Sequence, residues 1–145
     1  MFRYTILFCI LLTLSAYGNC FAQNEKTIDS LETKYQACLD EGKNMLDCSK
    51  SFYKVMDSML NIVYFKIAAK LDSNHKIQLR NEQRSWLTSR NVYFKMTLNK
   101  FKQKHPGKSP LGNSSGAQDD AMIMHDENAQ FVKERILALL KRTFN

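Results

Sequence analysis

The side chains suited to metal or acid–base chemistry are scattered along this sequence and do not converge on a site. The histidines His75, His105 and His125 stand far from one another and from the cysteines, whereas a metal site needs three or four ligands brought together. No nucleophile motif, P-loop or Rossmann glycine pattern occurs. We therefore predict no catalytic residue, no metal and no cofactor, and expect a binding protein rather than an enzyme.

The N-terminus has the organisation of an export signal. Arg3 precedes a nearly uninterrupted apolar run over residues 4–14, which is shorter than the roughly 20 residues of a membrane-spanning helix. We expect cleavage after Ala22, so that residues 1–22 are a signal peptide. Cys20 leaves open an alternative, lipidation as in a bacterial lipoprotein, although the residues before it match that signal poorly.

Cleavage after Ala22 would leave two cysteines, Cys38 and Cys48, in residues 23–145. An exported chain meets an oxidising compartment, so these two thiols are expected to form a disulfide. We therefore expect a periplasmic or secreted protein of one domain, with no transmembrane segment once the signal is removed.

Apolar residues recur at three- and four-residue spacing, and no stretch alternates long enough to predict a strand. The sequence predicts helices at about residues 27–39, 45–71, 74–104 and 117–142. A turn before residue 45 would make the first two helices a hairpin joined by the disulfide, with Asn44 and Asp47 resembling a capping box. The fold class is therefore all-α, a small bundle of three to four helices, with a loop at residues 105–116. The apolar face of the last helix is predicted to be Met122, His125, Ala129, Val132, Ile136, Leu139 and Leu140.

The charge balance favours anionic partners. The chain has 21 basic and 14 acidic residues, a net charge of +7, and removal of Arg3 with the signal would leave +6. Such a surface suits an anionic envelope polymer, a lipid surface or an acidic protein, and we expect no nucleic-acid partner. A solvated surface that only maintains solubility is the alternative. The candidate anion-binding residues are Lys95, Lys100, Lys102, Lys104 and Lys108.

A polar and aromatic motif spans the second and third predicted helices. Its residues are Leu60, Asn61, Tyr64, Gln83, Arg84, Trp86 and Arg90. We interpret it as a buried polar network that specifies the fold, in which Gln83 hydrogen-bonds across to Asn61 or Tyr64.

Trp86 is the only tryptophan of the chain. A single helical tryptophan is more often part of a core than a platform for stacking a sugar ring. We expect its indole to dock between the first two helices. Arg90, one turn further on, is expected to stack on the Trp86 ring or to pair with Asp57.

The cysteine pair together with this motif resembles the LprI-type lysozyme-inhibitor family of bacterial envelope proteins. The resemblance covers about residues 35–94, and we find no family motif after them. Two departures stand out: Asn91 follows Arg90 where aspartate is common, and Tyr93-Phe94 stand where a further cysteine is expected. The resemblance implies a small exported helical protein that binds lysozyme or another cell-wall hydrolase and inhibits it.

The residues alone leave other functions open. A basic adaptor for anionic envelope polymers or lipid, or a purely structural interaction domain, fits the same composition. Lysozymes of the common animal type are themselves basic, so a +6 partner would be repelled at long range. An inhibitor would need local acidic patches, for which Asp40-Glu41 or Asp119-Asp120 are candidates, or donors directed at the two catalytic carboxylates of the hydrolase.

Overall fold

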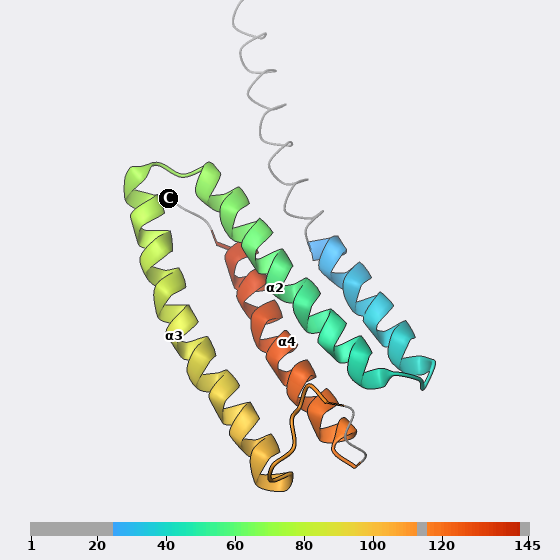
Figure 1. Cartoon of the computed structure of the whole chain (residues 1–145). Helices are drawn as coiled ribbons and strands as arrows, with labels where there is room; N and C mark the ends of the chain where they lie inside the picture. The colour runs from blue at the N-terminus through green and yellow to red at the C-terminus, as the bar shows by residue number, and fades with distance from the viewer. Residues whose placement is uncertain (1–24, 113–115, 143–145) are drawn as a thin grey trace, which may run out of the picture.

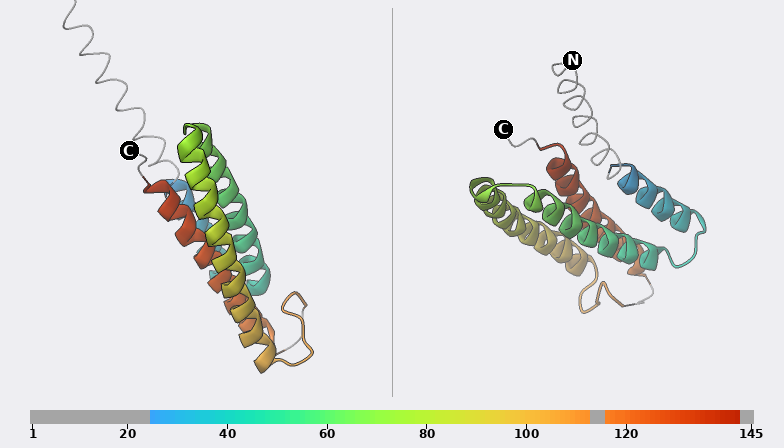
Figure 2. Two further views of the ribbon diagram at one scale, coloured as in Figure 1. Left: turned by 90° about the vertical axis from the view of Figure 1, so that its left-hand side faces the viewer. Right: turned by 90° about the horizontal axis from the view of Figure 1, so that it is seen from above.

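A computed structural model of the protein describes residues 25–112 and 116–142, so the predictions for Cys20 and Ala22 lie outside the described residues. The described residues form four helices and no strand, which confirms the predicted fold class. The helices are residues 25–40, α2 (Met45–Ala69), α3 (Ser73–Lys104) and α4 (Gln118–Leu140). They lie side by side in an elongated bundle (Figures 1 and 2). A search of the described helices finds none with the length and apolar character needed to cross a membrane.

The predicted disulfide between Cys38 and Cys48 is present, with Cα atoms 6.0 Å apart. It joins the last turn of the first helix to the first turn of α2. The connection between these helices reverses the chain at Gly42, whose φ of 67° lies in the left-handed region that glycine adopts without strain. The Gly42 N–H donates to the Leu39 carbonyl at 2.9 Å, which ends the first helix.

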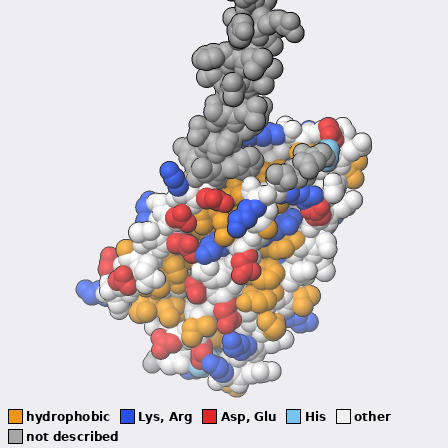
Figure 3. Space-filling view, turned by 180° about the vertical axis from the view of Figure 1, so that it is seen from behind, with side chains coloured by type: hydrophobic (Ala, Val, Ile, Leu, Met, Phe, Trp, Pro, Cys, Tyr) orange, Lys and Arg blue, Asp and Glu red, His pale blue; other side chains and the backbone are white. Residues whose placement is uncertain are grey.

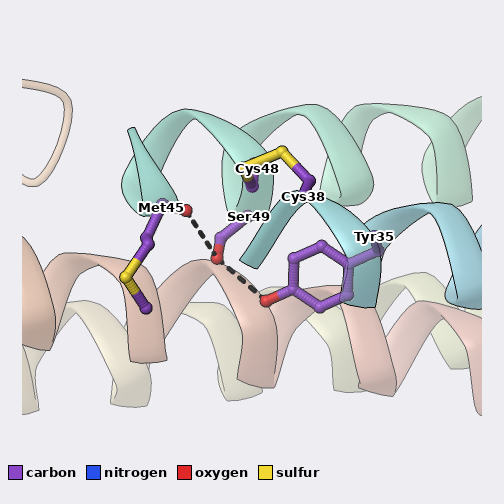
Figure 4. The surroundings of a disulfide bond; sticks show 5 residues. All are labelled: Tyr35, Cys38, Met45, Cys48 and Ser49. Carbon is purple, nitrogen blue, oxygen red and sulfur yellow. Dashed lines mark hydrogen bonds between the residues drawn. A yellow bond between two sulfur atoms is a disulfide. The ribbon is translucent and has the colours of Figure 1, made fainter. Parts of the chain in front are cut away.

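Noncovalent contacts beside the disulfide also join the first helix to α2 (Figure 4). The hydroxyl groups of Tyr35 and Ser49 lie 2.9 Å apart, and the Ser49 hydroxyl donates to the Met45 carbonyl at 3.3 Å. The Tyr35 ring stacks on Phe52 of α2 with ring centroids 4.3 Å apart. Burial of Tyr35 raises the pKa of its phenol, so the hydroxyl stays protonated at neutral pH. The first helix is therefore fixed to α2 by covalent, polar and aromatic contacts together.

The predicted capping box at the start of α2 is wrong. Asn44 is the residue before the helix, but its φ of 53° is left-handed and its side chain makes no capping hydrogen bond. The Asp47 N–H donates to the Asn44 backbone carbonyl at 2.8 Å instead. The Asp47 carboxylate lies 3.4 Å from Lys50. A capping side chain needs an extended backbone at the residue before the helix, and the left-handed conformation of Asn44 does not provide it.

Helix α4 occupies the centre of the bundle and packs against both α2 and α3, most extensively against α2. In the view from above in Figure 2, α4 runs alongside α2, on the side that faces away from the viewer of Figure 1. The main core is built from the inner faces of these helices and the first one. Its buried residues are Ile28, Phe52, Met56, Leu60, Val63, Ile67, Leu79, Ala129, Val132, Ile136, Leu139 and Leu140.

A smaller apolar cluster closes the end of the bundle nearest the loop between α3 and α4. Its buried residues are Leu46, Phe101, Ala117, Ala121 and Met124. Part of the connecting loop is attached to α2, because the Lys50 ammonium donates to the Leu111 carbonyl at 3.2 Å. His125, in the core face of α4, is also buried.

Helix α3 begins at the predicted break. Asp72 is its N-cap, and one carboxylate oxygen accepts the His75 N–H at 2.9 Å while the other lies 2.6 Å from His75 Nδ1. The backbone hydrogen bond from His75, followed by the contact with its ring, lowers the pKa of Asp72 below its ordinary value of 3.8. The carboxylate thus satisfies a helix N–H that has no partner within the helix.

Replacing Asp72 with alanine is expected to lower the melting temperature by a few degrees near neutral pH, because the helix loses its cap. The pKa is lowered on folding, so the stabilisation is present above the unfolded value and is lost as the pH falls through the folded value. The difference between wild type and Asp72→Ala should therefore shrink between about pH 5 and about pH 2. Thermal unfolding followed by circular dichroism measures it, with Asp72→Asn as the control that keeps a capping oxygen. A pH-independent difference would contradict this account.

Candidate functional site

Most of the motif residues line one groove between α2 and α3, although these helices make little direct contact with each other. The groove has a volume of about 300 Å³. Its α2 wall consists of Asp57, Leu60, Asn61, Tyr64 and Phe65, and its α3 wall consists of Arg80, Gln83, Arg84, Leu87 and Arg90. Residues three and four apart share a helix face, which explains why these positions converge when the two helices lie side by side.

Arg90 lines the groove and forms an ion pair with a residue of its opposite wall. Its Nη1 lies 3.6 Å from Asp57 Oδ1, and its guanidinium lies 5.7 Å from the centre of the Trp86 ring and 5.6 Å from that of Phe94. Both contacts predicted for Arg90, stacking on Trp86 and pairing with Asp57, are therefore present. The positive charge of Arg90 is matched within the protein, and the pair links α3 to α2.

Trp86 packs against the core as predicted, but against a different helix. Its half-buried ring stacks on Phe131 of α4, with centroids 5.8 Å apart and planes at 22°. Phe131 also stacks on Tyr93 at 4.5 Å. The expectation that the indole docks between the first two helices is wrong, because α4 lies behind α3 and supplies the aromatic surface. From the sequence alone, Phe131 is recognisable only as an apolar residue next to the predicted inner face of α4.

The predicted hydrogen bond from Gln83 to Asn61 or Tyr64 is also wrong. Gln83 Oε1 accepts from Arg135 Nε of α4 at 3.1 Å, and Asn61 donates to the Asp57 carbonyl within its own helix at 3.1 Å. The Arg135 guanidinium lies 5.9 Å from the Trp86 ring, and its burial lowers its pKa. Since Asn61 is exposed, the motif is only in part a buried network.

Two other arginines of the groove form no ion pair within the described residues. Arg80 and Arg84 are exposed and lie one helical turn apart on α3. Within residues 25–112 and 116–142, neither has an ion-pair partner. Arg84 is among the predicted motif residues, whereas Arg80, which stands before the motif, is not. A signal was available, because two arginines four residues apart share one helix face.

Two acidic side chains of α2 and α3 are paired with other arginines. Asp57 is paired with Arg90, and Glu82 is paired with Arg142 near the end of the chain. Phe65 stands at the rim with 67% of its surface exposed, and its ring meets that of Tyr64 edge to face at 5.4 Å. The groove therefore presents two uncompensated positive charges beside an exposed aromatic ring.

The predicted anion-binding lysines do not form a comparable site. Lys100 lies 3.0 Å from Glu127, and Lys104 lies 2.7 Å from Asp120, which also contacts His105 at 2.8 Å. The hydrogen bond from Lys104, followed by that from His105, lowers the pKa of Asp120. Lys95 and Lys102 are exposed, as is Lys108.

Charges of both signs alternate with apolar side chains over the rear face of the molecule (Figure 3). The net positive charge is therefore not concentrated on that face. Asp120 is a predicted candidate contact for a basic partner, but its carboxylate is already paired with Lys104 and His105. Over the described ranges, no group of three His, Cys, Asp or Glu side chains is placed to hold a metal ion.

An apolar groove of about 480 Å³ lies between the first helix and α2, next to the disulfide. Leu31, Phe52 and Val55 are among its lining residues, and its rim carries Lys34 and Asp47. The charges at this rim have both signs, so they select no particular partner. The α2–α3 groove carries three arginines against one acidic residue, Asp57, which is paired with Arg90, so it is the better candidate for a functional site.

Comparison with known proteins gives one match. A family model described as "Lysozyme inhibitor LprI" matches residues 32–139. No curated protein and no solved structure matches the chain. The match extends well beyond residues 35–94 and includes α4, whose Phe131 and Arg135 hold Trp86 and Gln83 of the motif in place. With most of its length covered, the chain belongs to the LprI family of lysozyme inhibitors.

Proposed function

We propose that this protein binds a lysozyme-type cell-wall hydrolase and inhibits it, using the groove between α2 and α3. Membership of a lysozyme-inhibitor family supports the activity. The observation that carries the choice of surface is that the motif residues on α2 and α3 line a groove in which Arg80 and Arg84 have no ion-pair partner among the residues that the structure describes. Neither arginine forms an ion pair within the described part of the bundle, so both are available to a partner.

We also propose that the protein acts outside the cytoplasm, in the periplasm or as a secreted protein. The Cys38–Cys48 disulfide supports this location, because such bonds persist in oxidising compartments. The apolar N-terminal sequence supports export by a signal peptide cleaved after Ala22. A hydrolase that attacks the cell wall would be met in the same compartment.

Inhibition is tested by adding the purified protein to a lysozyme and measuring hydrolysis of a cell-wall suspension and of a soluble chitooligosaccharide. We expect the rate to fall with both substrates and the effect to saturate at a fixed stoichiometry. Inhibition with the suspension alone would indicate coating of the anionic wall and would count against the proposal. Unchanged rates at a large excess of the protein, with several lysozyme types, would overturn it.

The competing function is a basic adaptor that binds anionic polymers or lipid through the segment from Lys95 to Lys108. The ion pairs of Lys100 with Glu127 and of Lys104 with Asp120 count against it. Reversing the charge of Lys100, Lys102 and Lys104 should leave inhibition within about threefold of wild type, as expected for charges outside an interface. Salt-sensitive binding to anionic vesicles that disappears in this variant, without inhibition by the wild type, would favour the adaptor.

A further inference from the structure

We infer that Arg80 and Arg84 form a two-pronged contact for a pair of carboxylates, and that their target is the catalytic carboxylate pair in the cleft of the inhibited hydrolase. This inference rests on the proposed function and specifies how the groove performs it. The partner surface would consist of two acidic side chains close together in a cleft.

The spacing of the two arginines matches such a target. Residues four apart on a helix have Cβ atoms about 5–6 Å apart. The two catalytic carboxyl groups of glycoside hydrolases are about 5–5.5 Å apart in retaining enzymes and about 6.5–9.5 Å apart in inverting ones. The long, flexible stems of Arg80 and Arg84 let their guanidinium groups reach either separation, and each planar fork can bind one carboxylate through two hydrogen bonds.

The surrounding charges leave these two arginines available. Asp57, which lines the groove, is paired with Arg90, and Glu82 of α3 is paired with Arg142. Asn61 and Gln83 add no charge to the groove. An approaching carboxylate pair would therefore meet two positive charges, while the one acid of the groove, Asp57, has its charge matched by Arg90. The whole chain carries +7, so a basic hydrolase would be repelled at long range.

Phe65 gives the contact an apolar anchor. Its ring is 67% exposed at the rim of the same groove, next to Tyr64. Aromatic and arginine side chains dominate the binding energy of many protein interfaces. An exposed ring beside two unpaired guanidinium groups is thus suited to a cleft whose apolar walls surround its acidic residues, and less suited to a flexible anionic polymer.

The test compares two double variants that remove the same charge from α3. Arg80→Gln/Arg84→Gln is expected to weaken binding to the hydrolase by about 100-fold, as loss of close charge pairs at an interface does. Lys95→Gln/Lys102→Gln, the matched control on the same helix, should change binding less than about threefold. Arg80→Lys/Arg84→Lys should give an intermediate loss, because lysine keeps the charge without the planar fork. Isothermal titration calorimetry measures each, and circular dichroism checks that the variants remain folded.

Two further measurements locate the contact in the cleft. A chitooligosaccharide that fills the hydrolase cleft should compete with the wild-type protein. A hydrolase whose two catalytic carboxyl groups are replaced by amides should bind about 100-fold more weakly. Equal loss in the Gln variants of the arginines and of the lysines, absence of competition, or full affinity for the amide form would overturn the inference. In each of those cases inhibition by the wild type would still support the proposed function, whereas a wild type that inhibits no hydrolase would overturn both.

Discussion

Replacing Ile136 with alanine is expected to lower the free energy of unfolding by about 3–4 kcal/mol, within the range for truncation of a buried isoleucine. The Ile136 side chain is completely buried in the main core, beside Val132 of the same helix. Truncation removes methyl and methylene groups from apolar contacts and leaves a cavity that the surrounding helices fill only in part. Because α4 packs against both α2 and α3, the cavity would weaken both contacts.

Chemical denaturation with urea, followed by circular dichroism, measures this loss. Ile123→Ala is the matched control, since it makes the same chemical change on the same helix at a side chain that is 45% exposed. It should cost less than about 1 kcal/mol, because most of the deleted surface is not in the core. Similar losses for the two variants would show that α4 is not packed as described. If the slope of the free energy of unfolding against urea concentration (the m value) is unchanged, the variants expose as much surface on unfolding as wild type does.

The central position of α4 shows what the sequence could and could not predict about the fold. Spacing identified its inner face correctly, since Ala129, Val132, Ile136 and Leu139 are all buried. Helical periodicity specifies which side of a helix is buried but not which helix covers that side. The sequence therefore gave no reason to place α4, rather than α2, against the aromatic side of α3.

The candidate site shows the same division between local and distant contacts. The pairing of Arg90 with Asp57 was predictable, because a short break between two long helices brings their facing sides together. The partner of Gln83 was not predictable, since Arg135 stands 52 positions further along the chain. That Arg80 has no ion-pair partner among the described residues could not be predicted, because it depends on the folded arrangement, in which Glu82 pairs with Arg142 and Asp57 with Arg90.

Removing the disulfide by replacing Cys38 and Cys48 with alanine is expected to lower the free energy of unfolding by about 2.5–3 kcal/mol. The bond closes a loop between residues ten positions apart and so restricts the unfolded chain. A loss of this size is a large fraction of the stability of a small domain. Urea unfolding of the double variant and of oxidised wild type measures this loss. Wild type in reducing buffer, which also lacks the bond, should agree with the double variant. A loss below about 1 kcal/mol would show that the other contacts of the hairpin suffice.

The same variant separates stability from inhibition. Cys48 and Asp57, the first groove residue of α2, lie nine positions apart on this helix, so the bond is about 14 Å along the helix axis from the groove. The residues that hold the groove in place, Phe131 and Arg135, belong to α4 and not to the disulfide hairpin. At temperatures well below its own melting point, the double variant is therefore expected to inhibit the hydrolase within about threefold of wild type, because its interface is unchanged. A complete loss of inhibition in a variant that remains folded would show that the binding surface is the groove beside the disulfide and not the α2–α3 groove.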